Sequence, residues 1–277
     1  MTQRRPTIGV VAISYNEERD MPGFLANLLP WVDEIVIVDD GSSDKTAELA
    51  LAAGSKVNFI LSPRIEGEYY ADQRNKGINA AQSDWLLHLD IDERASADLA
   101  NEIKEVLTRG EHDAYRYRRL NYFLNRPMQG GDWADWNQVH LAKREVLRFG
   151  GMFHETCDVT VSDDKIGQLD GLMFHINDES YAERLQKSSN YQEEVMAWVR
   201  EREGRVSAWN VIWAFAREFI VKFFFKKGIL DGVPGVIWAF HASNAAFRAR
   251  ALVWDEQNQI KRADLEEKIS QMWEDHQ

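Results

Sequence analysis

The sequence predicts an α/β fold, in which a Rossmann-like mixed sheet with flanking helices is followed by a C-terminal helical appendage. Short apolar runs alternate with helical patterns between residues 7 and 95, as they do in right-handed βαβ units. Three of these runs end in polar loops that carry carboxylates. From Ser180 onward the periodicity is helical only. We therefore expect one domain over residues 1–178 and a helical region over residues 179–277.

The first four apolar runs have the composition of short strands, and the first two read as buried on both faces. These runs are Thr7–Ser14, Glu34–Val38, Val57–Leu61 and Trp85–Leu89. Helices are predicted through Phe24–Leu29, over Lys45–Ala53 with Asp44 as its cap, and over Tyr69–Ala81. A further helix, Ala97–Thr108, follows Ser96, and a strand, Ala114–Phe123, alternates tyrosine with arginine.

Two carboxylates, Asp90 and Asp92, follow directly after the run Trp85–Leu89. In open α/β sheets ligands bind beyond the carboxyl ends of the strands, so both acids are expected at the mouth of a site. Two carboxylates this close repel each other unless a cation lies between them. Oxygen ligands suit Mg²⁺ or Mn²⁺, which often bridge to substrate phosphates. The pair therefore predicts a metal–diphosphate site, and the alternative is a solvated acidic turn.

Composition excludes several classes of protein. The formal net charge of −12 argues against a nucleic-acid binder, which would show a basic excess. The single cysteine, Cys157, permits no intrachain disulfide and suits a reducing compartment. No signal peptide or spanning apolar run is evident, so a cytoplasmic location is expected. The glycine-rich fingerprints of nicotinamide dehydrogenases and P-loop ATPases are missing.

Four segments resemble, in order, the successive motifs of family 2 glycosyltransferases: Ser14–Glu18, Val38–Asp44, Gln73–Gly77 and Leu89–Glu93. The resemblance implies the GT-A fold, a nucleotide-sugar donor and a divalent metal, Mn²⁺ or Mg²⁺. The residues that it implies for binding the nucleotide sugar are Ser14, Asn16, Glu17, Asp39, Asp40, Arg74 and Asp90.

Within that set, the resemblance places Asp39 and Asp40 near the base and ribose and Arg74 near the diphosphate. It makes Asp90 and Asp92 the metal ligands. The chemistry agrees, because carboxylates accept from base N–H groups and ribose hydroxyls, and arginine pairs with phosphate oxygens. The alternatives are a surface ion pair of Arg74 with Asp72 or Glu68, and a helix cap at Asn16-Glu17.

The next part of the chain is similar to the lipopolysaccharide-core glucosyltransferase-like branch of this family. An aromatic loop, Leu124–Trp136, precedes two strands expected to form a hairpin, Asn137–Ala142 and Val146–Phe149, and then His154-Glu155. On that resemblance Glu155 is the candidate general base, which takes the acceptor's proton in an inverting transfer. His154 is a metal or phosphate ligand, or an orienting partner. That branch tends to carry an arginine around His140. This sequence lacks it, which puts the acceptor's charge, or the role of that position, in doubt.

Three further side chains could each have a functional role or a purely structural one. Trp133 and Trp136 either stack on the acceptor sugar or belong to the core. His175, at the end of a short apolar strand, is either a metal ligand near the same site or a hydrogen-bonded core residue.

The helical region has one feature that contrasts with the acidic remainder of the chain. Residues 207–254 are rich in aromatic side chains and locally basic, and they resemble a monotopic hairpin in the membrane interface. The alternative is a hairpin packed on the catalytic domain or on a second subunit of a homodimer. The end of the chain, Asp255–Gln277, is a polar helix or a frayed tail.

These observations predict a metal-dependent inverting glycosyltransferase. It would move a hexose from a UDP-linked donor to a glycan or glycolipid of the cell envelope, such as lipopolysaccharide, at the cytoplasmic face of the membrane. Two alternatives stay open, a nucleotidyltransferase and a non-catalytic binder of nucleotides or glycans. The sequence fixes neither the sugar nor the acceptor.

Overall fold

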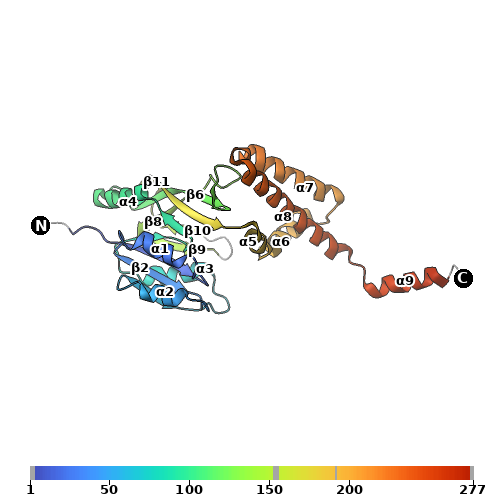
Figure 1. Ribbon diagram of the computed structural model, residues 1–277, viewed down its shortest axis with the longest axis horizontal. Coiled ribbons are helices and arrows are strands. Elements are labelled where there is room, and N and C mark those ends of the chain that lie inside the picture. The colour runs from blue at the N-terminus through green and yellow to red at the C-terminus, as the bar shows by residue number, and fades with distance from the viewer. Residues whose placement is uncertain (1–3, 152–155, 191, 275–277) are drawn as a thin grey trace. The chain divides into compact units, whose positions relative to one another are not determined.

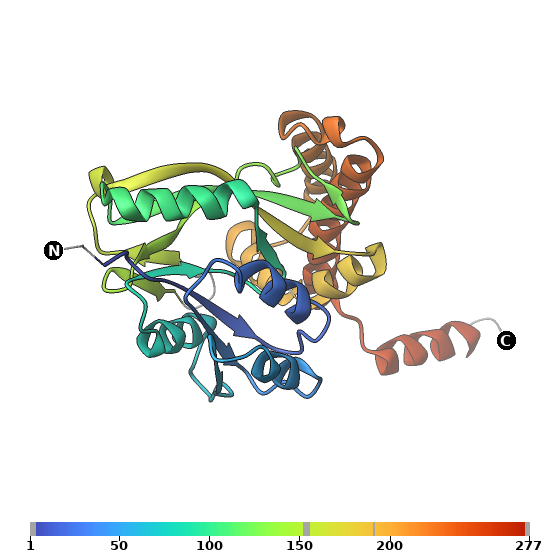
Figure 2. The same cartoon turned by 60° about the vertical axis from the view of Figure 1, so that its left-hand side comes forward.

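The computed structural model describes residues 4–151, 156–190 and 192–274. The chain divides into two compact units (Figures 1 and 2). The first unit comprises Met1–Pro127 and Trp133–Asn177, and the second comprises Met128–Asp132 and Asp178–Gln277. The short segment Met128–Asp132 therefore belongs with the C-terminal helices and not with the strands that flank it in sequence.

One half of the sheet in the first unit is parallel. Strand β1 (Ile8–Ser14) lies between β2 (Glu34–Asp39) and β4 (Trp85–His88), and β3 (Val57–Leu61) lies beyond β2. Ser14 is opposite Asp39, and Val11 is opposite His88. Because these strands run in one direction, the loops that follow β1, β2 and β4 gather at the same edge of the sheet.

The other half of the sheet contains antiparallel pairs. From β4 the order continues through β8 (Asn137–Lys143), β6 (Ala114–Phe123), β11 (Ile166–Asp178) and β5 (Glu93–Ala95). Strand β8 is antiparallel to both β4 and β6, β5 is antiparallel to β11, and β7 (Arg126–Pro127) pairs with β6. The structure thus confirms the predicted α/β class, a mixed sheet with flanking helices followed by C-terminal helices.

The predicted hairpin of residues 137–142 with 146–149 is wrong. Strand β8 has β4 on one edge and β6 on the other, so neither edge is open to the strand that follows it. Strand β9 (Leu147–Gly150) pairs instead with β10 (Thr156–Val159) in a separate two-stranded antiparallel sheet.

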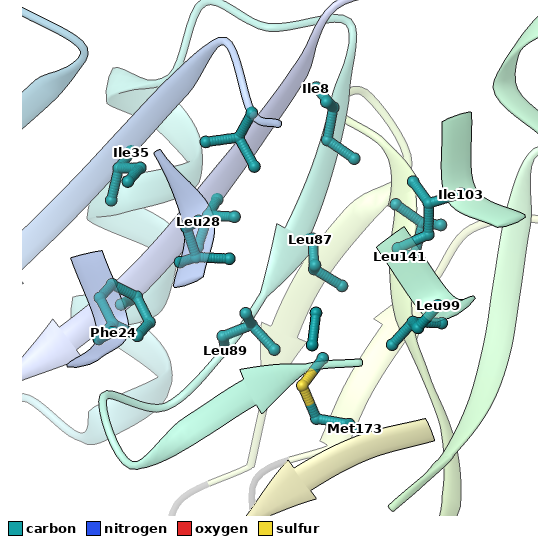
Figure 3. Packing of buried hydrophobic residues seen from close by; sticks show 14 of the residues in the cluster. Ile8, Phe24, Leu28, Ile35, Leu87, Leu89, Leu99, Ile103, Leu141 and Met173 are labelled. Atoms are coloured by element: carbon teal, nitrogen blue, oxygen red, sulfur yellow. The ribbon is translucent and has the colours of Figure 1, made fainter. Parts of the chain in front are cut away.

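Helices cover both faces of the main sheet. On one face, α1 (Met21–Leu28) and α4 (Ala97–Arg109) contribute Phe24, Leu28, Leu99 and Ile103 to the larger core (Figure 3). Helix α4 begins after Ser96, whose hydroxyl accepts from the Leu99 N–H, and ends at Gly110 in the left-handed conformation.

The other two helices of this unit are α2 (Thr46–Ala52) and α3 (Tyr70–Ala80). Helix α3 lies very close to the sheet, since a Cβ at Gly77 would meet a methyl of Val11 at 2.5 Å. Because α3 lies so close to the sheet, Arg74, one turn before Gly77, reaches the edge where β4 ends.

The second unit is helical in its described part. It contains α5 (Tyr181–Asn190), α6 (Gln192–Glu203), α7 (Ala208–Ile220), α8 (Gly232–Asn258) and α9 (Arg262–Glu274). Two short helical turns, η2 (Val221–Phe225) and η3 (Gly228–Asp231), join α7 to α8. Phe240 of α8 packs against Phe215 and Phe219 of α7. Within the described ranges, no helix is long and apolar enough to cross a membrane.

Candidate functional site

The loop after β1 and the loop after β2 are bound to each other. Asn16 adopts the left-handed backbone conformation, with φ of 57°. Its N–H donates to the Ser42 hydroxyl at 2.8 Å, and its side-chain oxygen accepts from the Ser43 N–H at 2.8 Å. Asparagine tolerates this conformation better than most residues do. The motif that begins at Ser14 therefore shapes a loop pair at the sheet edge, and helix α1 begins only at Met21.

Asp39 is buried beneath these loops, with 1% of its surface exposed. One carboxylate oxygen accepts from the N–H groups of Gly41 and Ser42, and the other accepts from the hydroxyls of Ser14 and Ser42. Four donors thus surround the carboxylate that was predicted to lie near the base or ribose. In this structure Ser14 and Asp39 order the loop that carries Asp40.

Asp40 binds an arginine that the sequence analysis missed. Its carboxylate accepts from the Arg64 N–H at 2.6 Å and from Arg64 Nε at 2.7 Å. The Arg64 guanidinium lies over the ring of Tyr70, 3.9 Å from its centroid. Half of the Tyr70 surface is exposed. The Tyr70 ring, with the Arg64 guanidinium stacked on it, therefore borders the loop that carries Asp40.

Arg74 reaches from α3 to the end of β4. Its Nε donates to His88 Nε2 at 2.8 Å, and a terminal nitrogen donates to Asp90 Oδ1 at 3.2 Å. The two other partners considered for Arg74 are engaged elsewhere. Glu68 accepts from Lys76 at 2.8 Å, and Asp72 accepts from the Tyr69 N–H at 2.8 Å.

The Arg74–Asp90 pair places a fixed cation beside Asp90, the first acid of the Asp-x-Asp motif. Burial is the largest single influence on the pKa of Asp90 and raises it. The positive charge of Arg74, together with smaller contributions from nearby histidines, nevertheless brings that pKa below its usual value. Asp90 is therefore a carboxylate at neutral pH, available to a metal ion.

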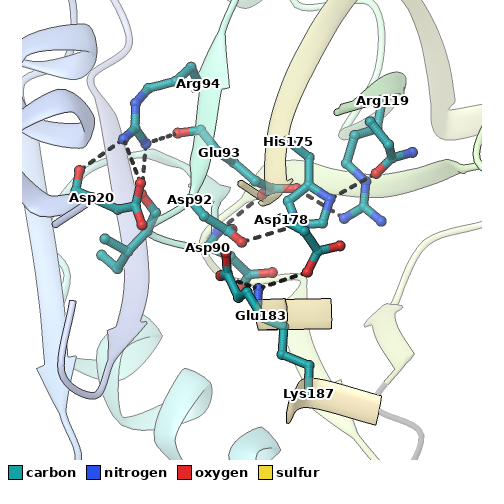
Figure 4. Close-up of polar contacts among 12 residues, drawn as sticks. Asp20, Asp90, Asp92, Glu93, Arg94, Arg119, His175, Asp178, Glu183 and Lys187 are labelled. Atoms are coloured by element: carbon teal, nitrogen blue, oxygen red, sulfur yellow. Dashed lines mark hydrogen bonds and ion pairs between the residues drawn. The ribbon is translucent and has the colours of Figure 1, made fainter. Parts of the chain in front are cut away.

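Asp92, the second acid, contacts a histidine from a distant strand. Its Oδ2 lies 3.2 Å from Nε2 of His175 in β11 (Figure 4). The other ring nitrogen, Nδ1, lies 2.8 Å from the side-chain oxygen of Asn121 in β6. The amide nitrogen of Asn121 donates in turn to the Trp133 carbonyl at 2.6 Å. Asn121, which the sequence analysis did not single out, thus orients His175 toward Asp92.

Glu93 and Arg119 support the turn that carries both acids. Glu93 is 1% exposed, and its carboxylate accepts from the Asp90 N–H at 3.0 Å and pairs with Arg119 at 3.1 Å (Figure 4). Burial and then the charge of Asp90 raise the pKa of Glu93 to about 7. On the opposite side, Arg94 donates to the carbonyls of Ile91 and Glu93.

Negative charge is in excess at this edge. Burial, and then the charges of Asp92 and Asp20, raise the pKa of Glu17 to about 7. Among the described residues, no three histidine, cysteine or acidic side chains gather closely enough to hold a metal ion by themselves. However, Mg²⁺ and similar ions are usually held by one or two carboxylates together with substrate phosphates. Asp90 and Asp92 carry oxygen donors of the type that such an ion prefers.

Trp133 and Trp136 are both partly buried. The Trp133 ring stacks on Phe123 with centroids 5.9 Å apart. The Trp136 ring lies under the Arg119 guanidinium at 4.5 Å and packs against the larger core. His154 and Glu155, the predicted phosphate or metal ligand and general base, lie outside the described residues.

His140, where an arginine was expected, lies in an aromatic cluster. Its ring contacts those of His88, Trp136 and Phe149, with centroids 5.1 to 6.0 Å apart. Burial is the main reason that the pKa of His140 is lowered to about 4. The histidine is therefore neutral at pH 7, and this position supplies an apolar wall instead of a cation.

Comparison with known proteins gives a consistent picture. Residues 9–161 match the family described as Glycosyl transferase family 2. An uncharacterized glycosyltransferase of Rickettsia prowazekii is 25% identical over 270 residues, which cover 91% of this chain and 90% of the relative.

Two solved structures resemble the chain more distantly. TarS of Staphylococcus aureus, crystallised with UDP-GlcNAc, is 15% identical, with 89% of this chain and 84% of that chain covered and a TM-score of 0.46. Glucosyl-3-phosphoglycerate synthase of Mycobacterium tuberculosis, in complex with Mn²⁺, UDP and glucosyl-3-phosphoglycerate, is 18% identical. Its match covers 69% of this chain and 78% of that chain, with a TM-score of 0.46.

Proposed function

The chain belongs to glycosyltransferase family 2, and we propose that it moves a hexose from a UDP-linked donor to a glycan or glycolipid, with inversion at the anomeric carbon. The observation that carries the proposal is the arrangement at the end of β4. There Asp90 and Asp92, both in the segment Leu89–Glu93, pair with Arg74 of α3 and with His175 of β11.

The donor is proposed to lie along the edge formed by the loops after β1, β2 and β4. Asp40 and the Tyr70 ring border the place proposed for the base and ribose, and the Ser14 and Asn16 loop contacts hold that border in shape. Arg74 faces the proposed diphosphate. Its planar guanidinium suits two phosphate oxygens at once, although His88 and Asp90 already orient it.

Asp90, Asp92 and His175 are proposed to hold a divalent cation, Mn²⁺ or Mg²⁺. Such an ion supplies charge neutralisation on the departing diphosphate. The protein's own part is to keep Asp90 ionised and to aim both carboxylates. Arg74 lowers the pKa of the first, and Asn121 holds the His175 ring beside the second.

The acceptor hydroxyl needs a base as it attacks the anomeric carbon, and we assign that role to Glu155. Replacing Glu155 by Gln should abolish transfer while nucleotide binding persists, and wild-type rates would remove this assignment alone. His154 is proposed as an orienting partner or a ligand of the phosphate or metal, and Trp133 and Trp136 as acceptor contacts. The proposed acceptor is a lipid-borne glycan such as lipopolysaccharide core, reached by a peripheral protein at the cytoplasmic membrane face.

The function can be tested with the purified protein and a panel of nucleotide sugars. We expect UDP-hexoses to raise the melting temperature when Mn²⁺ is present, because ligands of the folded state stabilise it by mass action. We also expect slow, metal-dependent release of UDP from one of them. Nucleotide binding that needs no metal and leads to no turnover would contradict the proposal and indicate a binding protein.

A further inference from the structure

The second unit carries an apolar tip, which we define as Phe224, Phe225, Ile229, Leu230 and Val233. The exposed fractions of these side chains are 55, 77, 51, 65 and 71%. All five belong to one stretch of ten residues that spans η2, η3 and the start of α8. Apolar side chains that are exposed singly need no explanation, but a contiguous exposed group marks an interaction site.

A stripe of exposed residues on α7 leads to this tip. Trp209, Ile212, Trp213 and Ile220 are 69, 62, 52 and 41% exposed. Ile212 and Trp213 follow Trp209 by three and four residues, and Ile220 follows Trp213 by seven, which places them on one face of the helix. Phe224 follows Ile220 by four residues. The rings of Trp209 and Trp213 stack, with centroids 6.2 Å apart and planes 10° apart. The exposed apolar side chains therefore extend from the tip along α7.

The tip is held in a defined shape. The N–H groups of Gln129 and Gly130 donate to the Asp231 carboxylate at 2.7 and 2.9 Å, and the Gly131 N–H donates to the Lys226 carbonyl at 2.7 Å. A side chain at Gly130 would collide with the backbone at Lys227. The segment Met128–Asp132 thus braces the turn from behind, while the apolar side chains point to solvent.

The charge around the tip favours a lipid surface over a protein partner or a second copy of this chain. Residues 205–254 contain seven basic and two acidic residues, although the whole chain has a formal net charge of −12. Lys226 and Lys227 are exposed beside the tip, although the Lys226 ammonium also lies 3.7 Å from the Asp132 carboxylate. Aromatic and aliphatic side chains beside lysines suit the boundary between acyl chains and anionic headgroups. A second copy would bring the same positive charge to the contact.

We propose that the apolar tip and the α7 stripe dock the protein on an anionic lipid surface. The five tip side chains would enter the acyl boundary, and Lys226 and Lys227 would meet the headgroups. This docking rests on the proposed function only for its purpose, which is to bring a glycolipid acceptor within reach.

The test is sedimentation of the full chain with vesicles of phosphatidylcholine, alone or mixed with phosphatidylglycerol. The wild-type protein should sediment with the anionic vesicles, and less so in high salt. The double variant Phe225→Glu/Leu230→Glu should lose about tenfold or more in partitioning, since it places two charges in the acyl boundary. The variant Lys226→Gln/Lys227→Gln should lose about fivefold per lysine on anionic vesicles only.

A matched control is Leu51→Glu/Ile260→Glu, which changes two apolar residues that are 66 and 75% exposed and lie outside the tip and stripe. This control should sediment as the wild type does. Equal sedimentation of the Phe225→Glu/Leu230→Glu protein and the wild type would overturn the proposal. The proposal would also be overturned if light scattering showed that the wild type is a dimer that does not bind vesicles and that the Phe225→Glu/Leu230→Glu variant is a monomer.

Failure of docking and failure of the proposed function give different results. UDP release from a UDP-hexose, measured without vesicles, does not involve the tip and should be the same in Phe225→Glu/Leu230→Glu and wild type. A protein that binds vesicles but never releases UDP retains the docking surface and loses the transferase assignment.

Discussion

His175 Nε2 lies 3.2 Å from Asp92 Oδ2, although 83 residues separate them along the chain. The contact joins β11 to the turn after β4, and the Asn121 side chain fixes the ring from its other side. A metal-ligating histidine commonly gives its second ring nitrogen to such a partner, which sets its orientation. The contact therefore predicts how the proposed metal site should respond to mutation.

Asn121→Ala should weaken metal binding, although Asn121 is not proposed to contact the metal or the substrate. Loss of an outer partner of this kind typically costs 10- to 100-fold in metal affinity, so the Mn²⁺ concentration for half-maximal UDP release should rise by about tenfold. Maximal turnover at saturating Mn²⁺ should fall much less. The control is Asn137→Ala, in which an exposed asparagine of the neighbouring strand β8 is changed. An unchanged Mn²⁺ dependence in Asn121→Ala would remove this positioning role.

Asp92→Ala should abolish transfer and leave the fold intact. The residue is partly exposed at the strand end and not part of the core, so the melting temperature without metal should stay close to that of the wild type. Circular dichroism and UDP release measure the two effects separately. Asp164→Ala, at an exposed position in the same unit, is the control. A folded Asp92→Ala protein with wild-type turnover would exclude the metal role.

Arg74→Lys should raise the KM for the nucleotide-sugar donor by about tenfold or more, with a smaller effect on kcat. The guanidinium binds His88 and Asp90 through different nitrogens, a fork that a single ammonium group cannot reproduce. The comparison is Arg118→Lys, which makes the same change at an exposed position of β6. If both variants share the wild-type KM, Arg74 does not contact the donor.

Local sequence patterns were sufficient to bound individual strands and helices of the first unit. Strand β6 has the predicted bounds, and α4 begins after Ser96 and ends at Gly110 as expected, because apolar periodicity and capping residues act over a few positions. The polar loops after β1, β2 and β4 meet at one edge because parallel strands require it.

The antiparallel half could not be predicted in the same way. The partners of β8 and the Glu93–Arg119 pair depend on contacts between segments far apart in sequence. Strand β11 is longer than the predicted strand Gly171–His175, and there a local signal was present. Leu169, Gly171 and Met173 are buried and alternate with the exposed Gln168 and Asp170, which is the period of a half-buried strand.

Glu17→Gln should stabilise the metal-free protein at alkaline pH. Burial and the charges of Asp92 and Asp20 raise the pKa of Glu17 from 4.5 to about 7, so the folded state prefers the protonated form. That preference contributes fully below pH 4.5 and is lost as the pH rises through about 7. Glutamine keeps the neutral shape, and the variant should therefore exceed the wild type by about 1–3 kcal/mol at pH 8 and match it near pH 4.

Urea unfolding at a series of pH values measures this difference, with Glu66→Gln as the exposed control. Saturating Mn²⁺ should shrink the gap at pH 8, because a bound cation offsets the repulsion between Glu17 and Asp92. A gap that is the same at both pH values would show that Glu17 does not sense the carboxylates at the strand edge. The site would then lack the excess of negative charge that a divalent cation is proposed to neutralise.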